Sequence, residues 1–203
     1  MPPSAAFYFD LASPLAYLAT ERVLHVLGGP AEWRPVQLGG GQSDVPREEI
    51  ERRALDLGLQ PIRWPEPFPF DSSLAMRVAT YAASIGRAVP FAQAAFRQAF
   101  AGGHSLEDPD FVLIAAAACE MHPTAVLRGA EMRSIVERLE GTTAAAVAAG
   151  VSDVPAVLVG GHVFAGDGAL ERAAEHMRVE GGRSACEDVG YELRIQQAGS
   201  RSP

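Results

Sequence analysis

The chain has 203 residues, of which 48% are hydrophobic and 21% charged, and its formal net charge is -8 at pH 7. This length suits one domain with an insertion, and the acidic balance argues against a nucleic-acid partner, which requires a basic surface. All 17 basic residues are arginine, so Schiff-base and P-loop chemistries, which require lysine, are excluded.

The first elements in chain order form a strand, a helix and a second strand. Residues 5–10 are an aromatic-rich run typical of a buried strand, and apolar residues at helical spacing follow from Ser13-Pro14 to Gly28. Residues 31–38 form a second strand-like run. A strand, helix and strand in this order predict a βαβ unit with parallel pairing.

The pattern then becomes helical for about a hundred residues. The segment "PREEIERRALDLG" predicts an amphipathic helix, and four prolines among aromatic residues predict an extended segment after it. Further helices are predicted at about 72–86, 89–101, 109–120 and 130–149.

Strand signals return near the end of the chain. Runs at 155–159 and 162–165 flank a Gly160-Gly161 turn, and a helix is predicted over 168–178. These elements predict an α/β protein with a thioredoxin-like fold, formed by residues 1–40 and 150–180, with an all-helical insertion at 41–149. The tail 181–203 is predicted to be partly disordered.

Targeting and metal-binding signals are lacking. The N-terminal "MPPSAAFYFD" has neither the basic region nor the apolar region of a signal peptide, and no apolar run approaches the ~20 residues that span a bilayer. Cys119 and Cys186 lie in no C-x-x-C motif, and the histidines have no metal-ligand spacing. We therefore expect a cytoplasmic protein with no membrane partner and no metal.

Ser13 stands where the first strand turns into a helix. A serine followed by proline is a favoured helix N-cap, and capping alone is a sufficient reason for it. A nucleophilic role is disfavoured because no partner base is evident. A third role is to stabilise the thiolate of a bound cofactor. Lowering a thiol pKa of ~8.5 by two units takes about 2.7 kcal/mol, mostly within reach of one charge-assisted hydrogen bond and a helix dipole.

Four segments together resemble the 2-hydroxychromene-2-carboxylate isomerases of the DsbA-like and kappa-class glutathione transferase superfamily. They are "FYFDLASPLAYLAxERV", "WRPVQLGG", "RRALDLGLQPIRWPEPFPFDSSLAMR" and "GVSDVPAVLVGGHVFAGDGAL", and the resemblance covers about residues 5–178. It implies that Ser13 and Ala16 stand where DsbA-type oxidoreductases carry the cysteines of C-P-x-C. Dithiol exchange is then lost, and the Ser13 hydroxyl faces the sulfur of glutathione or another low-molecular-weight thiol.

The resemblance also implies a cofactor site across the fold. Val154 precedes a cis Pro155 and offers its backbone to the cysteinyl part of the thiol, whereas Gly166 and Asp167 hold its γ-glutamyl end. The alternative for Asp167 is that it caps the last helix. The loop after the second strand is shorter than is usual in the family and lacks its lysine, so Gln42 or Arg47 is expected to substitute.

Substrate contacts are expected from Tyr17, Trp64 and Arg77. The Pro/aromatic segment with Trp64, Phe68 and Phe70 is expected to wall an apolar site, with interdomain packing as the alternative. Arg77 suits a substrate carboxylate, although an exposed helical arginine is the commoner case.

The resemblance implies a thiol-dependent isomerase that acts on a small aromatic or unsaturated acid and forms a homodimer. Two alternatives stay open: a kappa-like glutathione transferase, and a non-catalytic binding module with the same fold.

Overall fold

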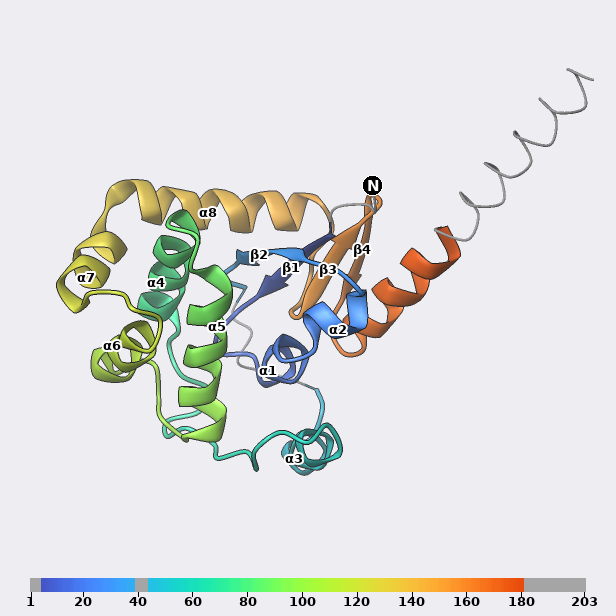
Figure 1. Cartoon of the computed structure of the whole chain (residues 1–203), viewed down its shortest axis with the longest axis horizontal. Helices are drawn as coiled ribbons and strands as arrows, with labels where there is room; N and C mark the ends of the chain where they lie inside the picture. The colour runs from blue at the N-terminus through green and yellow to red at the C-terminus, as the bar shows by residue number, and fades with distance from the viewer. Residues whose placement is uncertain (1–4, 39–43, 181–203) are drawn as a thin grey trace, which may run out of the picture.

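The computed structural model describes residues 5–38 and 44–180, so the expectations for Gln42, Cys186 and the tail 181–203 lie outside the described residues. Four strands form one sheet in the order β2-β1-β3-β4. As predicted, β1 (Ala5–Phe9) pairs in parallel with β2 (Ala31–Pro35), and β3 (Ala156–Val159) forms an antiparallel hairpin with β4 (His162–Ala165). The expected thioredoxin-like fold is confirmed (Figure 1).

Strand β1 is buried on both faces because helices cover the sheet from both sides. Phe7 and Phe9 pack against Trp33, with ring centroids 5.0 and 5.8 Å away, in the larger core. Ala6 and Tyr8 face the other way and belong to a second cluster with Ala146 from α8 (Arg133–Ala148). Alternate residues of one strand therefore serve two apolar layers.

The single helix expected after Ser13 is two short helices, α1 (Pro14–Thr20) and α2 (Val23–Leu27). The first ends where Arg22 N–H donates to the carbonyl of Ala19, 2.9 Å away, in a tighter last turn. Glu21 is held in the break by two hydrogen bonds from Arg97, each 2.7 Å. A tertiary ion pair at the break thus accompanies a helix end that apolar spacing did not predict.

The helical part contains one helix more than predicted. Its members are α3 (Arg47–Asp56), α4 (Ser73–Ser84), α5 (Ala88–Phe96), a π-helical turn (Arg97–Ala101), α6 (Pro109–Ala117), α7 (Pro123–Glu131) and α8. The unpredicted helix α7 packs closely on α4, and Gly129 permits this approach. A Cβ at this position would lie only 2.5 Å from the Tyr81 ring. Within the described chain, no helix is long and apolar enough to cross a membrane.

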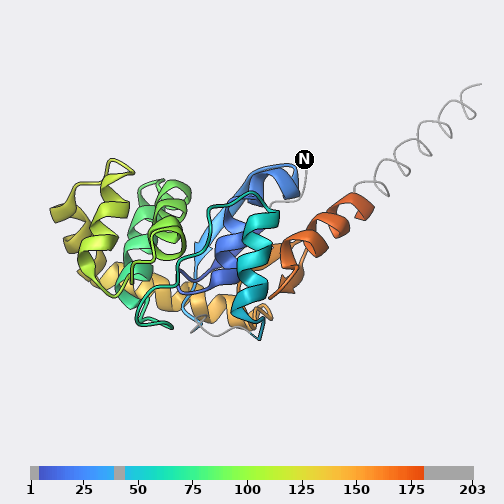
Figure 2. The same ribbon diagram turned by 90° about the horizontal axis from the view of Figure 1, so that it is seen from below.

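Helix α3 and the last helix of the described chain both flank the candidate site. The last helix covers 169–180, close to the predicted range, and projects from the body of the molecule (Figure 1). Figure 2 shows α3 in front of α1, with helices α4 to α7 on one side and this last helix on the other. An aromatic group holds α1 in place, since Tyr17 lies 5.5 Å from Phe100 and Phe9 lies 6.0 Å from Phe96, between ring centroids.

Candidate functional site

A closed set of hydrogen bonds shapes the turn from β1 to α1. The carboxylate of Asp10, which is fully buried, accepts from Ala12 N–H at 3.0 Å and from the Ser72 hydroxyl at 2.8 Å. Its backbone carbonyl accepts from Ser13 N–H at 3.0 Å. Asp10 therefore ties the turn to the start of α4 and fixes the position of Ser13.

The Ser13 side chain caps α1 and also reaches across the fold. Its oxygen accepts from Ala16 N–H at 3.2 Å, which confirms the capping role, and its hydroxyl donates to the Val154 carbonyl, also 3.2 Å away. Ser13 is 2% exposed. The next amide, Leu15 N–H, has no hydrogen-bond partner within the described chain, as is usual at the second position of a helix.

The peptide bond between Val154 and Pro155 is cis, as the resemblance implied. Val154 N–H donates to the Asp153 carboxylate at 2.7 Å, and the Val154 carbonyl accepts from Ser13. Both backbone groups expected to meet a cofactor thus have a partner inside the protein. A ligand that took the amide would displace the Asp153 side chain.

Gly166 and Asp167 lie beside this segment, because Gly166 N–H donates to the Pro155 carbonyl at 2.9 Å. Gly166 has φ of +74°, and a Cβ there would lie 3.1 Å from the Asp153 carboxylate, so both its conformation and its space favour glycine. The Asp167 carboxylate accepts from Arg53 at 2.6 Å instead of capping the helix 169–180. The alternative capping role is therefore not seen.

Arg53 belongs to a charged cluster on α3. Its Nε donates to Glu49 at 2.8 Å, one helical turn away, and its Nη1 donates to Asp167. Hydrogen bonds from Arg52 and then Arg53 lower the pKa of Glu49 to about 2. The pKa of Arg53 is raised, first by its bond to Asp167 and then by its bond to Glu49. Arg53 therefore stays a fixed cation.

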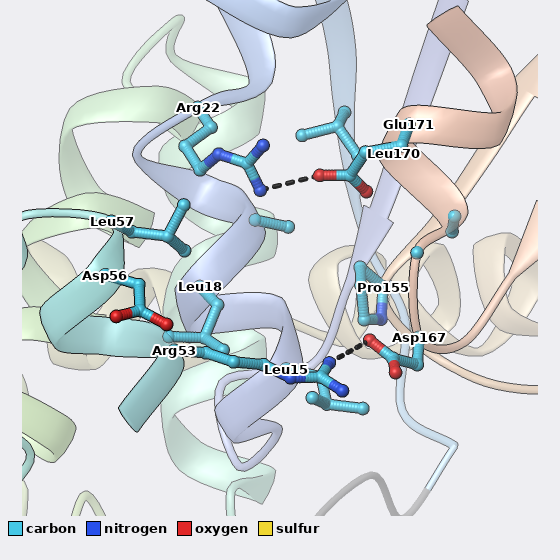
Figure 3. A pocket seen from close by; sticks show the side chains of 13 residues that line it. Leu15, Leu18, Arg22, Arg53, Asp56, Leu57, Pro155, Asp167, Leu170 and Glu171 are labelled. Carbon is cyan, nitrogen blue, oxygen red and sulfur yellow. Dashed lines mark hydrogen bonds and ion pairs between the residues drawn. The ribbon is translucent and has the colours of Figure 1, made fainter. Parts of the chain in front are cut away.

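Two cavities meet beside Leu15 and Asp167, which line both of them. The first, about 440 Å³, is a mainly apolar groove with an ion pair at either end: Arg53 with Asp167, and Arg22 with Glu171 at 2.7 Å (Figure 3). We call it the aliphatic groove. Its apolar lining consists of Leu15, Leu18, Ala19, Leu57, Pro155, Ala169 and Leu170.

The second cavity, about 620 Å³, is lined by both charged and aromatic side chains, and we call it the aromatic cavity. Trp64 and Phe68 form one wall, and the Arg47 guanidinium lies 4.7 and 5.2 Å from their ring centroids. Trp64 donates to Glu51 at 2.6 Å, which fixes the indole. The lining of the aromatic cavity comprises Pro14, Leu15, Asp44, Val45, Arg47, Ile50, Trp64, Phe68, Pro69, Asp153 and Asp167.

The structure brings Ser13, Val154, Pro155, Gly166 and Asp167 together and places Trp64 in the wall of the adjacent cavity. The other expected residues lie elsewhere, within the described chain. Tyr17 is 2% exposed and lines a separate cavity of about 370 Å³ with Glu21 and Arg97; Phe70 is in the core; Arg77 is half-buried on α4 and lines neither cavity. Burial, followed by the charge of Glu21, raises the pKa of Tyr17.

Three contributors were not expected: the Asp10 carboxylate, Asp153 and Arg53. The Asp before Ser-Pro was a visible signal for the first, whereas Arg53 depends on the docking of α3. Cys119 is buried, its Sγ contacts the Ala115 carbonyl at 3.3 Å, and burial raises its pKa, so it is no reactive partner for this site.

Comparisons with known proteins agree with the fold. A family model described as a DSBA-like thioredoxin domain matches residues 6–178. A search among curated proteins found no match. One similar solved structure is a 2-hydroxychromene-2-carboxylate isomerase, with a TM-score of 0.72 and 17% identity over 92% of this chain and 98% of its own.

Two other similar solved structures are oxidoreductases. A probable DsbA oxidoreductase from Streptomyces coelicolor has a TM-score of 0.73 and 16% identity over 99% of this chain and 92% of its own. The cytosolic disulfide reductase DsbM from Pseudomonas aeruginosa has a TM-score of 0.60 and 12% identity over 90% of this chain and 99% of its own. At these identities the likeness is one of fold.

Proposed function

Because the chain belongs to the DsbA-like thioredoxin domain family, we propose that it is an isomerase that uses glutathione or another low-molecular-weight thiol. The proposed substrate is a small aromatic or unsaturated acid of the 2-hydroxychromene-2-carboxylate type. The observation that carries the proposal is the hydrogen bond from Ser13 to the Val154 carbonyl, beside two ligand-sized cavities.

The residues present fit a thiol ligand in three respects. Ser13 and Leu15 N–H supply hydrogen-bond donors at the start of α1, suited to an anionic sulfur. Val154 N–H is held by a side chain of its own segment, Asp153, which can turn away without unfolding any element. Asp167 is half-exposed and able to meet an ammonium group, its side chain being 47% accessible.

When bound, a thiol supplies a nucleophile that adds reversibly to a conjugated double bond, so that the bond order falls and rotation becomes possible. The protein's part is positional and electrostatic. The Ser13 hydroxyl turns from the Val154 carbonyl towards the anionic sulfur, and Leu15 N–H adds a second donor. Arg47, whose guanidinium lies over the Trp64 and Phe68 rings, binds the carboxylate of the acid.

The residues at positions 13 and 16 support the isomerase proposal over disulfide exchange. Positions 13 and 16 are serine and alanine, and the cysteine that the structure describes, Cys119, is buried far along the chain in the helical part. The resemblance places the reactive dithiol of related oxidoreductases at 13 and 16. We therefore keep the isomerase as the leading proposal.

A titration with thiols tests the proposal. We expect glutathione or another small thiol to bind the wild-type chain in isothermal calorimetry, and Ser13→Ala to weaken this binding by about tenfold, the effect of losing one charge-assisted hydrogen bond. Ser84→Ala, an exposed serine at the end of α4, is the matched control and should bind as the wild type does. Absence of binding by any thiol at millimolar concentration would refute the proposal.

A non-catalytic binding module is the second candidate, because Ser13 is nearly inaccessible and its hydroxyl already has an acceptor. Thiol binding with no turnover of 2-hydroxychromene-2-carboxylate would favour this candidate. Turnover that requires the thiol and falls in Ser13→Ala would favour the isomerase. Formation of a stable adduct with an electrophile would instead indicate the transferase alternative.

A further inference from the structure

Tyr17 lines a cavity of about 370 Å³ that shares no lining residue with the aliphatic groove or the aromatic cavity. Its ring is enclosed by Phe96 and Phe100, with centroids 6.3 and 5.5 Å away, so its phenol oxygen is the end that meets the cavity. This oxygen has no hydrogen-bond partner within the part of the chain that the structure describes. Since burial raises the pKa of Tyr17, the phenol keeps its proton at neutral pH and is an unused donor.

The two charged residues of this cavity neutralise each other. Nε and Nη2 of Arg97 each donate to one carboxylate oxygen of Glu21, at 2.7 Å. A charged ligand would have to compete with this bidentate ion pair, which is among the stronger side-chain interactions. The cavity therefore favours an uncharged ligand.

The other polar side chains of the cavity are uncharged. They are the Tyr17 hydroxyl and the amides of Gln60 and Gln98, and neither amide has a hydrogen-bond partner among residues 5–38 and 44–180. A primary amide carries a donor beside an acceptor, and glutamine pairs with a matching planar edge through two parallel hydrogen bonds. A carboxamide presents such an edge.

The backbone holds the cavity walls in place. Gln98 belongs to the π-helical turn Arg97–Ala101, a geometry that is frequent at functional sites. Gly102 closes the turn, because a Cβ there would lie 2.7 Å from the Gln98 carbonyl oxygen. On the other wall, Arg63 N–H donates to the Phe100 carbonyl at 2.7 Å and so ties the segment after α3 to the turn. The cavity is therefore formed before any ligand binds.

We propose that Tyr17, Gln60 and Gln98 form a second ligand site, which takes a small uncharged molecule by a planar carboxamide edge. The Tyr17 hydroxyl donates to the carbonyl oxygen of the ligand, and the glutamines accept from its N–H groups and donate to its oxygen. Glu21 and Arg97 stay paired beside the ligand. The site is independent of the proposed thiol chemistry, because none of its residues lines the cavities beside Ser13.

Calorimetry of the full-length protein with three benzene derivatives tests the ligand class. Benzamide carries the whole carboxamide edge, acetophenone keeps the carbonyl but has no N–H group, and benzoate carries a charge. We expect benzamide to bind the wild type. The other two should each bind at least about threefold more weakly, the effect of one lost uncharged hydrogen bond.

Two conservative variants locate the binding. Tyr17→Phe removes only the phenol oxygen, so benzamide affinity should fall about threefold to tenfold while the urea midpoint does not fall, since the oxygen has no partner inside the described chain. Gln98→Met should abolish the preference for benzamide over acetophenone. The matched controls Tyr81→Phe and Gln93→Met line none of these three cavities and should bind as the wild type does.

Three results would overturn the proposal. The first is no binding of benzamide to the wild type at millimolar concentration. The second is equal affinity for all three probes. The third is benzamide affinity that is unchanged in both Tyr17→Phe and Gln98→Met, which would place the molecule elsewhere. If Tyr17→Phe does not fold, Gln98→Met decides the question.

Discussion

The two ends of helix α1 lie in different surroundings, although only one turn separates them. At its start, Ser13 belongs to a polar turn, and the neighbouring Leu15 lines two cavities. One turn later, Tyr17 is packed against Phe96 and Phe100. The difference indicates that the two ends of α1 have different roles. Aromatic packing at one end fixes the position of the helix, and the other end presents hydrogen-bond donors.

The largest expected effect is at the aromatic end. Phe96 is fully buried and contacts both Phe9 and Tyr17, so Phe96→Ala should lower the free energy of unfolding by about 3–5 kcal/mol in a denaturant titration. The affinity of the folded protein for a thiol should change less than about twofold, because the substitution lies away from the polar end of the helix. A large loss of affinity with little loss of stability would contradict these separate roles of the two ends of α1.

A smaller stability effect is expected at the polar end. Ser13→Ala removes the cap of α1 and the donor to the buried Val154 carbonyl, so the free energy of unfolding should fall by about 1–3 kcal/mol. Thermal or urea unfolding measures this loss. The free energy of unfolding of the control Ser84→Ala should stay within about 0.5 kcal/mol of the wild-type value. A Ser13→Ala protein as stable as the wild type would show that the cap contributes little.

Replacing two glycines by alanine should change the free energy of unfolding in opposite directions. Gly166→Ala places a Cβ at φ of +74° and 3.1 Å from Asp153, so it should cost about 1–2 kcal/mol. Gly141→Ala lies in α8, where a Cβ would meet nothing within 4 Å, and should stabilise the protein by about 0.5–1 kcal/mol. Equal effects of the two substitutions in the same unfolding assay would remove the special role of Gly166.

The smallest expected effect is on the stability of the protein at low pH, and it depends on Glu49. The folded-state pKa of Glu49 is about 2, below its ordinary value of 4.5, so its ion pairs stabilise the protein above pH 4.5 and this contribution is lost as the pH falls towards 2. Glu49→Gln should therefore lose less stability over that range than the wild type. Unfolding midpoints across the range measure it, and identical slopes for the two proteins would contradict the assignment.

The sequence predicted most of the fold, because strands rich in aromatic and β-branched residues and glycine turns are local signals. It did not predict the break between α1 and α2, which coincides with a pair between Glu21 and Arg97 from another helix. It also missed α7, because the segment from Pro123 is short and its Gly129 favours close packing on Tyr81 over helix propensity.

The candidate site divides in the same way. Ser13, Val154-Pro155 and Asp167 follow from short motifs, and the structure brings them together. Asp153 and Arg53 were not predicted, because their roles depend on a side-chain rotamer and on where α3 docks. Tyr17 shares a helix with Ser13, but helical geometry turns it into the aromatic interior.

The pKa of the bound thiol tests the central claim most directly. Ultraviolet absorbance of the thiolate, followed against pH with the full-length protein in excess over glutathione, reports it. We expect a pKa about two units below the reference value of ~8.5 in the wild type, and a return of at least about one unit towards that value in Ser13→Ala. A bound thiol that titrates at the pKa of free glutathione in both proteins would contradict the role of Ser13.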